Sequence, residues 1–119
     1  MSDRRNNERI QMYSSALVYI EGYDAEIEAI VTNLSEENIG LKCRISDEQK
    51  KKIEDSKMIT FQFVDTYLEG KKAKTDVVQA CALIQRMEYS DGECFIGGVV
   101  RDENFKRYVL RRKLSPYYK

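Results

Sequence analysis

Residues 26–43 read EIEAIVTNLSEENIGLKC, and this pattern predicts two β-strands joined by a turn. In the first half, Ile27, Ala29 and Val31 alternate with Glu26, Glu28 and Ile30, which is typical of a strand with one buried face. The segment Asn33–Asn38 is rich in residues that favour turns, and residues 39–43 resume as a strand. Asn33 and Ser35 are expected on one side of the chain, with Leu34 pointing into the core.

Similar patterns on either side of this segment predict a small all-β domain. Strands are expected at residues 12–20, 58–65, 77–89 and 93–100, and residues 67–75 are expected to form a solvated loop or hairpin tip. The pattern at 77–89 alone also fits a helix, but its β-branched start and the turn at 90–92 favour a strand. A capping box at residues 46–49 predicts a short helix to about Asp55, and an apolar i, i+3, i+4 face predicts a final helix at 102–114. We expect a six-stranded antiparallel β-barrel with a short internal helix and a C-terminal helix. Residues 1–119 then form one domain, with a flexible arm at 1–11 and the barrel at 12–100.

The composition limits the classes of function. The chain has 119 residues, and its 20 basic and 20 acidic side chains give zero net charge, which argues against binding DNA or RNA. It has no histidine, and its acidic residues show no ligand spacing, so we expect no catalytic residue, no metal and no cofactor. The sequence contains no apolar run long enough to insert into a membrane and no signal peptide, which predicts a cytoplasmic protein.

Two short motifs carry the functional signal. The first places Arg4, Arg5 and Arg9 on a polar N-terminal segment, where guanidinium groups can bind phosphate oxygens or the edge of a guanine. The second is the Asn33–Asn38 segment, in which Asn38 is expected to take the left-handed conformation that a tight turn needs. Taken separately, the first motif can be a solvated charged tail and the second an ordinary Asn/Ser-rich turn.

The order and spacing of the two motifs resemble those of PilZ domains. In that family RRxxxR precedes the first strand, and [D/N]xSxxG follows the second. This chain has Arg4-Arg5-Asn6-Asn7-Glu8-Arg9 and then Asn33-Leu34-Ser35-Glu36-Glu37-Asn38, with Asn38 in place of the final glycine. Residues 95–100, FIGGVV, also resemble the late strand that precedes the family's C-terminal helix.

The resemblance implies a bacterial receptor for cyclic di-GMP, not an enzyme. It implies that Arg5 and Arg9 hold phosphates and guanine edges, that Arg4 assists by stacking, and that Asn33 and Ser35 contact the ligand, with Asn38 at the turn. Ordering of the arm would then signal to an unidentified downstream protein in motility, biofilm formation or virulence. The alternative is a PilZ-like adaptor that does not bind the nucleotide and acts through protein contacts.

Overall fold

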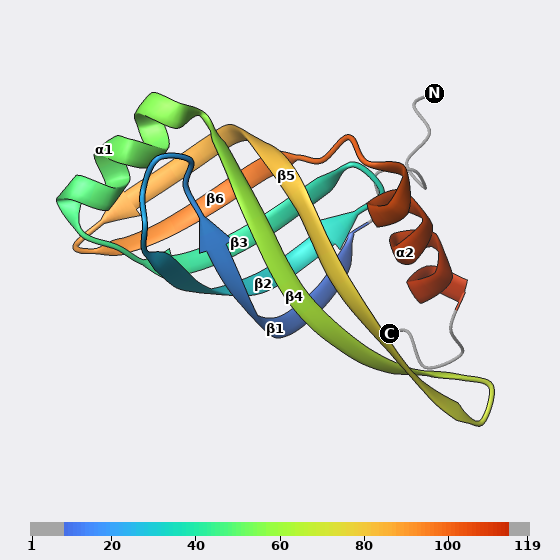
Figure 1. The fold of residues 1–119 in the computed structure, drawn as a ribbon. Helices are drawn as coiled ribbons and strands as arrows, with labels where there is room; N and C mark the ends of the chain where they lie inside the picture. The colour runs from blue at the N-terminus through green and yellow to red at the C-terminus, as the bar shows by residue number, and fades with distance from the viewer. Residues whose placement is uncertain (1–8, 115–119) are drawn as a thin grey trace.

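The computed structural model describes residues 9–114 and forms a barrel closed by two helices (Figure 1). The elements are β1 (Ile10–Tyr19), β2 (Glu26–Ser35), β3 (Asn38–Arg44), α1 (Asp47–Ser56), β4 (Met58–Glu69), β5 (Lys72–Ser90), β6 (Glu93–Val99) and α2 (Glu103–Leu114). The strands pair antiparallel in the closed order β1-β2-β3-β6-β5-β4. The predicted fold, six antiparallel strands with an internal and a C-terminal helix, is confirmed.

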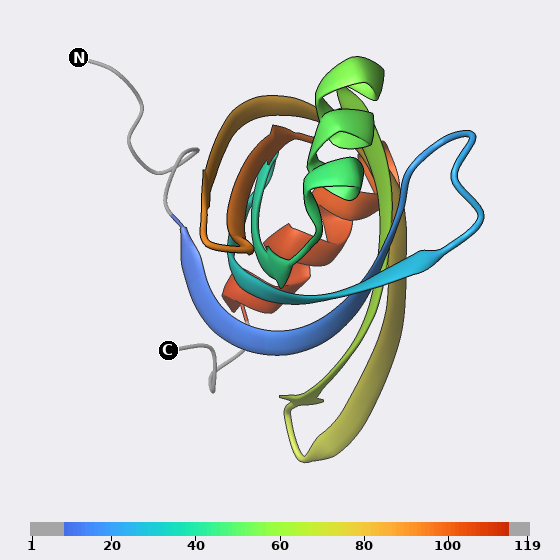
Figure 2. The same cartoon turned by 90° about the vertical axis from the view of Figure 1, so that its left-hand side faces the viewer.

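The helices lie at opposite ends of the barrel, so that the view down one end shows α1 in front and α2 behind it (Figure 2). The predicted capping box starts α1, because Ser46 Oγ accepts from the Gln49 amide at 3.1 Å and Gln49 Oε1 accepts from the Ser46 amide at 2.9 Å. The apolar face expected on the C-terminal helix is also present, and Phe105 packs edge-on against Phe61 with ring centroids 5.8 Å apart.

The core fills the inside of the ring through strict alternation along the strands. On β4, the side chains of Ile59, Phe61 and Phe63 are almost fully buried, while their neighbours face outward. Burying a side chain of this size stabilises the fold by about 2 kcal/mol. No helix within residues 9–114 is long and apolar enough to cross a membrane.

Four boundaries differ from the sequence-based expectation. The barrel begins at Ile10 and not at residue 12, because Ile10 is buried and pairs with Leu34. Residues 67–75 are mostly strand, since β4 and β5 continue to a two-residue tip at Gly70 and Lys71 (Figure 1). The barrel ends at Val99 and α2 begins at Glu103, each one residue from the expected position.

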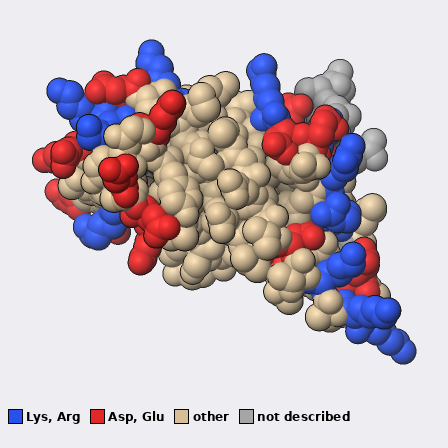
Figure 3. All heavy atoms as spheres, viewed as in Figure 1, with Lys and Arg blue, Asp and Glu red and all other residues tan. Residues whose placement is uncertain are grey.

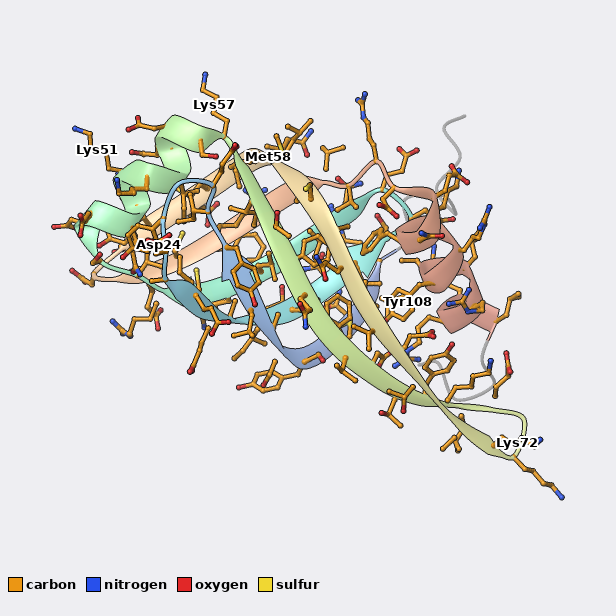
Figure 4. The ribbon with its side chains drawn as sticks, viewed as in Figure 1. Asp24, Lys51, Lys57, Met58, Lys72 and Tyr108 are labelled. Carbon is orange, nitrogen blue, oxygen red and sulfur yellow. The ribbon has the colours of Figure 1, made fainter. Side chains whose placement is uncertain are left out.

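Ion pairs fix α2 on the barrel. Tyr108 projects from α2 toward the β4–β5 pair (Figure 4) and donates to Asp65 Oδ2 at 2.7 Å. Arg112 Nε donates to the same oxygen at 2.8 Å, and both members of this ion pair are largely buried. Burial, together with the hydrogen bond to Asp65, raises the pKa of Tyr108 well above its usual value. The Tyr108 hydroxyl therefore stays protonated as a donor to a buried carboxylate.

Candidate functional site

A β-bulge at Thr32 sets the geometry of the second sequence motif. The pairing of β2 with β3 shifts between Val31, which lies opposite Leu41, and Asn33, which lies opposite Gly40. Val31 points inward, so simple alternation of side chains along β2 would also direct Asn33 inward. The extra residue of the bulge switches this alternation, so that Asn33 points outward instead. As a result Leu34 is fully buried, as predicted, and Asn33 faces outward and is only partly buried.

The outward Asn33 meets the last arginine of the first motif. Arg9 Nη1 donates to Asn33 Oδ1 at 2.6 Å, and Asn33 Nδ2 donates to Thr32 Oγ1 at 3.1 Å. A hydrogen bond from a guanidinium is charge-assisted and therefore among the stronger ones. The fold thus brings together two of the six predicted site residues from motifs 24 residues apart. Arg4 and Arg5 lie outside the described residues.

Gly40 makes room for this contact. A Cβ built on Gly40 would lie 2.6 Å from Asn33 Nδ2 and 3.0 Å from Thr32 Oγ1, closer than side-chain atoms normally approach. The Asn33 amide therefore lies where a side chain at position 40 would be. Only a glycine lets the backbone of β3 approach Asn33 this closely.

The pairing register places a second glycine beside Gly40. Gly40 lies opposite Gly97 on β6, and Gly97 lies opposite Arg86 on β5. We call the two glycines the glycine floor: Gly40 is buried beneath the Asn33 amide, and Gly97, between it and Arg86, is half-buried. The Arg86 guanidinium lies 6.0 Å from the centroid of the Phe95 ring and 3.0 Å from Glu88 Oε2.

The turn after Asn33 differs from the expectation in one respect. The turn residues are Glu36 and Glu37, and Asn38 is the first residue of β3. Within residues 9–114, the non-glycine residues with positive φ are Lys57 and Asp91, so the left-handed conformation predicted at Asn38 is wrong. Because neither turn residue has positive φ, the reversal needs no glycine-like residue.

Asn38 and Ser35 form a pair of their own. Ser35 is buried at 1% exposure, and Asn38 Nδ2 donates to Ser35 Oγ at 3.4 Å. Ser35 lies two residues beyond Asn33 on the same strand, roughly 7 Å along it. The structure therefore arranges the described site residues as two contacts, Arg9–Asn33 and Asn38–Ser35.

The turn itself is attached to α2. Glu36 is 7% exposed, and its carboxylate lies 2.8 Å from Lys113 Nζ near the end of α2. The Val100 amide donates to the Glu37 carbonyl at 2.9 Å. Sequence reasoning treated these two acidic residues only as a turn, because the position of α2 over this end of the barrel is a tertiary feature.

The site combines groups suited to a planar, anionic ligand. Arg9 and Arg86 supply guanidinium groups, the Asn33 amide supplies a donor and an acceptor, and the half-buried Gly97 has no side chain to keep a flat ring away from the backbone. A groove of about 960 Å³ begins beside this area and is lined by Thr32, Ile30 and Lys42, among others. Of these residues, the sequence alone indicated only Arg9 and Asn33.

Comparisons with known proteins identify the fold. The chain resembles the Bacillus subtilis inhibitor of motility MotI/DgrA, with a TM-score of 0.54, 14% identity and coverage of 89% of this chain and 49% of that one. The PlzA protein of Borreliella burgdorferi, solved in complex with c-di-GMP, gives a TM-score of 0.53, 10% identity and coverage of 89% and 50%. The PilZ domain of CeSA from a cellulose-synthesizing bacterium gives 0.50, 13% identity and coverage of 87% and 92%.

These likenesses establish a PilZ-like fold. The chain spans about half the length of the first two structures, whereas its coverage of the isolated PilZ domain is nearly complete. No family model matches the sequence, and no curated protein matches it. The predicted resemblance to PilZ domains is therefore confirmed at the level of the fold.

Proposed function

We propose that this chain is a receptor for cyclic di-GMP. The observation that carries the proposal is the 2.6 Å hydrogen bond between Arg9 and Asn33, which joins the two motifs on which the resemblance to PilZ domains rests. The shared fold supports it, because the PlzA protein has this fold and was solved in complex with the same nucleotide. The absence of histidine and the zero net charge agree with a binding protein for one small anion.

In this proposal the ligand lies over the glycine floor and meets arginine side chains at its edges. Arg9 and Arg5 bind phosphate oxygens and the O6 and N7 acceptors of a guanine, and Arg4 stacks on a base. Asn33 and Ser35 complete the contacts from β2. Arg86 stacks on the second base from the opposite edge of the floor. Gly97 allows a ring to approach the backbone, and Gly40 makes room for the Asn33 amide.

Signalling follows from the position of the arginines on two parts of the chain. A ligand held by both the N-terminal segment and the barrel fixes that segment against the barrel and creates a new surface. An unidentified partner protein binds this surface, and motility, biofilm formation and virulence are the candidate processes that it regulates. Signalling through a bound partner requires no catalytic group in this chain.

One observation favours a second function, a PilZ-like adaptor that does not bind the nucleotide. Asn38 stands where the family motif has glycine, and its amide donates to the hydroxyl of Ser35, a predicted ligand contact. If this pair persists, the hydroxyl is less available to a ligand. Protein contacts alone would then carry the function.

Calorimetric titration with cyclic di-GMP distinguishes the two functions. The receptor predicts saturable binding, with GTP and cyclic AMP as inactive controls. Arg9→Ala and Asn33→Ala should each weaken binding roughly ten- to hundredfold, because a hydrogen bond to a charged group contributes about 1.5–3 kcal/mol. Arg107→Ala, which removes an exposed arginine of α2, should leave the affinity unchanged. If cyclic di-GMP gives no heat of binding and does not raise the melting temperature of the protein, the adaptor function is supported.

A further inference from the structure

The outer face of β4 and β5 is free of charge over most of its length. On β4 its outward side chains are Met58, Thr60, Gln62, Val64, Thr66 and Leu68, and on β5 they are Thr75, Val77, Gln79, Cys81 and Leu83. We call these residues the neutral face. In the space-filling view the charged side chains gather at the two ends of the molecule, and the centre is uncharged (Figure 3). In a chain with 34% charged residues, such a face is unusual.

The apolar side chains of the neutral face are well exposed. Val77 is 67% exposed and its cross-strand partner Val64 is 50% exposed, which places an apolar pair at the middle of the face. Met58 and Leu83 form a second such pair, at 38% and 48% exposure. The two pairs lie six residues apart along β4, roughly 20 Å, with threonine, glutamine and cysteine side chains between them.

The polar side chains of the face are partly satisfied within the sheet. The hydroxyls of Thr66 and Thr75 lie 3.1 Å apart across the strands, and Thr60 Oγ1 lies 3.5 Å from Cys81 Sγ. Burying these hydroxyl groups in an interface therefore costs less free energy than burying hydroxyl groups that are hydrogen-bonded only to water. The threonine and glutamine side chains also carry both donors and acceptors, so the face can hydrogen-bond to a copy of itself.

We propose that the neutral face is the interface of a two-fold dimer of this chain. A two-fold axis brings the same patch of both subunits together, so any charge near the axis meets its own copy. The neutral face has no charge to repel its copy, and it offers no charge to attract a charged protein or nucleic acid. The valine pair at its centre would meet its equivalent across the axis.

The size of the face fits a weak, reversible dimer. Ten residue steps along β4 span about 33 Å, β4 and β5 together are about 10 Å wide, and β1 pairs with β4 over the four residues Ala16–Tyr19. The projected area is about 390 Å², roughly half of the 800 Å² that each partner of a standard interface buries. β1 lies between β4 and Asn33 on β2, and the groove beside the Arg9–Asn33 contact extends to Gln62 and Val64 of the neutral face.

Sedimentation velocity from micromolar to millimolar concentration tests the proposal. The native chain should show a reversible monomer–dimer equilibrium. Val77→Asp and Val77→Lys should each raise the dissociation constant at least about tenfold, since like charges then meet at the axis. An equimolar mixture of the two variants should restore association as a heterodimer. Leu114→Asp adds the same charge at an exposed leucine of α2 and should leave the equilibrium unchanged.

Cross-linking gives a second readout that does not depend on a substitution. Cys81 is exposed on the neutral face, whereas Cys43 and Cys94 are buried. Cys81 lies four residues from Val77, roughly 13 Å along β5, so a bismaleimide whose spacer spans about 26 Å should link two native chains through Cys81. A protein that stays monomeric at millimolar concentration would overturn the proposal, as would a dimer that survives both Val77 variants or a mixture that fails to form the heterodimer. Each Val77 variant is first checked for native circular dichroism.

Discussion

The Gly40→Ala substitution tests how the site is built. A single methyl group at position 40 would lie 2.6 Å from Asn33 Nδ2 and 3.0 Å from Thr32 Oγ1. The Asn33 amide is at the end of a side chain and can rotate away, whereas the β3 backbone is held by its hydrogen bonds to β2 and β6. We therefore expect the methyl group to displace the amide and to break its hydrogen bond with Arg9.

The magnitude follows from the proposed ligand contact that is lost, because the displaced Asn33 amide no longer reaches the nucleotide. A hydrogen bond to a charged group contributes about 1.5–3 kcal/mol, and the exposed position of the Arg9–Asn33 pair places this contact at the lower end. The affinity for cyclic di-GMP should fall about tenfold. The free energy of unfolding should change by less than about 1 kcal/mol, because the methyl group also reduces the freedom of the unfolded chain.

Calorimetry and urea unfolding measure the two quantities on the same variant. Gly98→Ala is a matched control, because a Cβ there would lie 2.9 Å from the Cβ of buried Ala82. That variant should lose stability while the folded fraction keeps its affinity.

A double-mutant cycle gives the sharpest form of the test. In an Asn33→Ala background, Gly40→Ala should weaken binding little further, because the displaced group is already absent. Fully additive losses, or a Gly40→Ala protein that binds like the native chain, would refute the account of the site.

The remaining predictions concern stability, measured by urea unfolding. Asp65→Ala should cost about 3 kcal/mol because it leaves the largely buried Arg112 without its carboxylate partner, whereas Glu93→Ala, in an exposed ion pair with Arg44, should cost less than about 1 kcal/mol. Ser46→Ala should cost about 1 kcal/mol through loss of the helix cap. The raised pKa of Tyr108 contributes stability that is full below the unfolded-chain value of about 10 and is lost as pH rises above it, so Tyr108→Phe should flatten the alkaline decline. A decline as steep as in the native chain would contradict that role.

Local sequence patterns predict most of the fold, because the alternation of a strand and the capping of a helix depend on residues that are close together in the sequence. The strand at Ile59–Phe63 and the capping box at Ser46 are examples. The hairpin arm beyond Asp65 was missed, since Tyr67 is buried by its tertiary contacts and not by an apolar neighbourhood in sequence. A charged, glycine-containing stretch is ambiguous between a loop and the end of a long hairpin.

The candidate site was predictable only in part, for two physical reasons. The bulge at Thr32 decides which way Asn33 points, and a bulge leaves little trace in the sequence. The glycine floor depends on β3 pairing with β6, a contact between strands that are not neighbours in the chain, so Gly97 and Arg86 could not be placed beside Gly40. The left-handed conformation of Asn38 was predicted because the chain was expected to reverse there, but the turn residues are Glu36 and Glu37 and neither has positive φ.

The measurement that tests the central claim most directly is a titration of the ¹⁵N-labelled protein with cyclic di-GMP, followed by amide chemical shifts. The receptor account predicts saturable shifts concentrated at Thr32, Asn33, Gly40 and Gly97, with Val77 on the neutral face unaffected. GTP and cyclic AMP should produce no such pattern. Spectra unchanged at high ligand concentration, or shifts confined to residues away from the glycine floor, would contradict it.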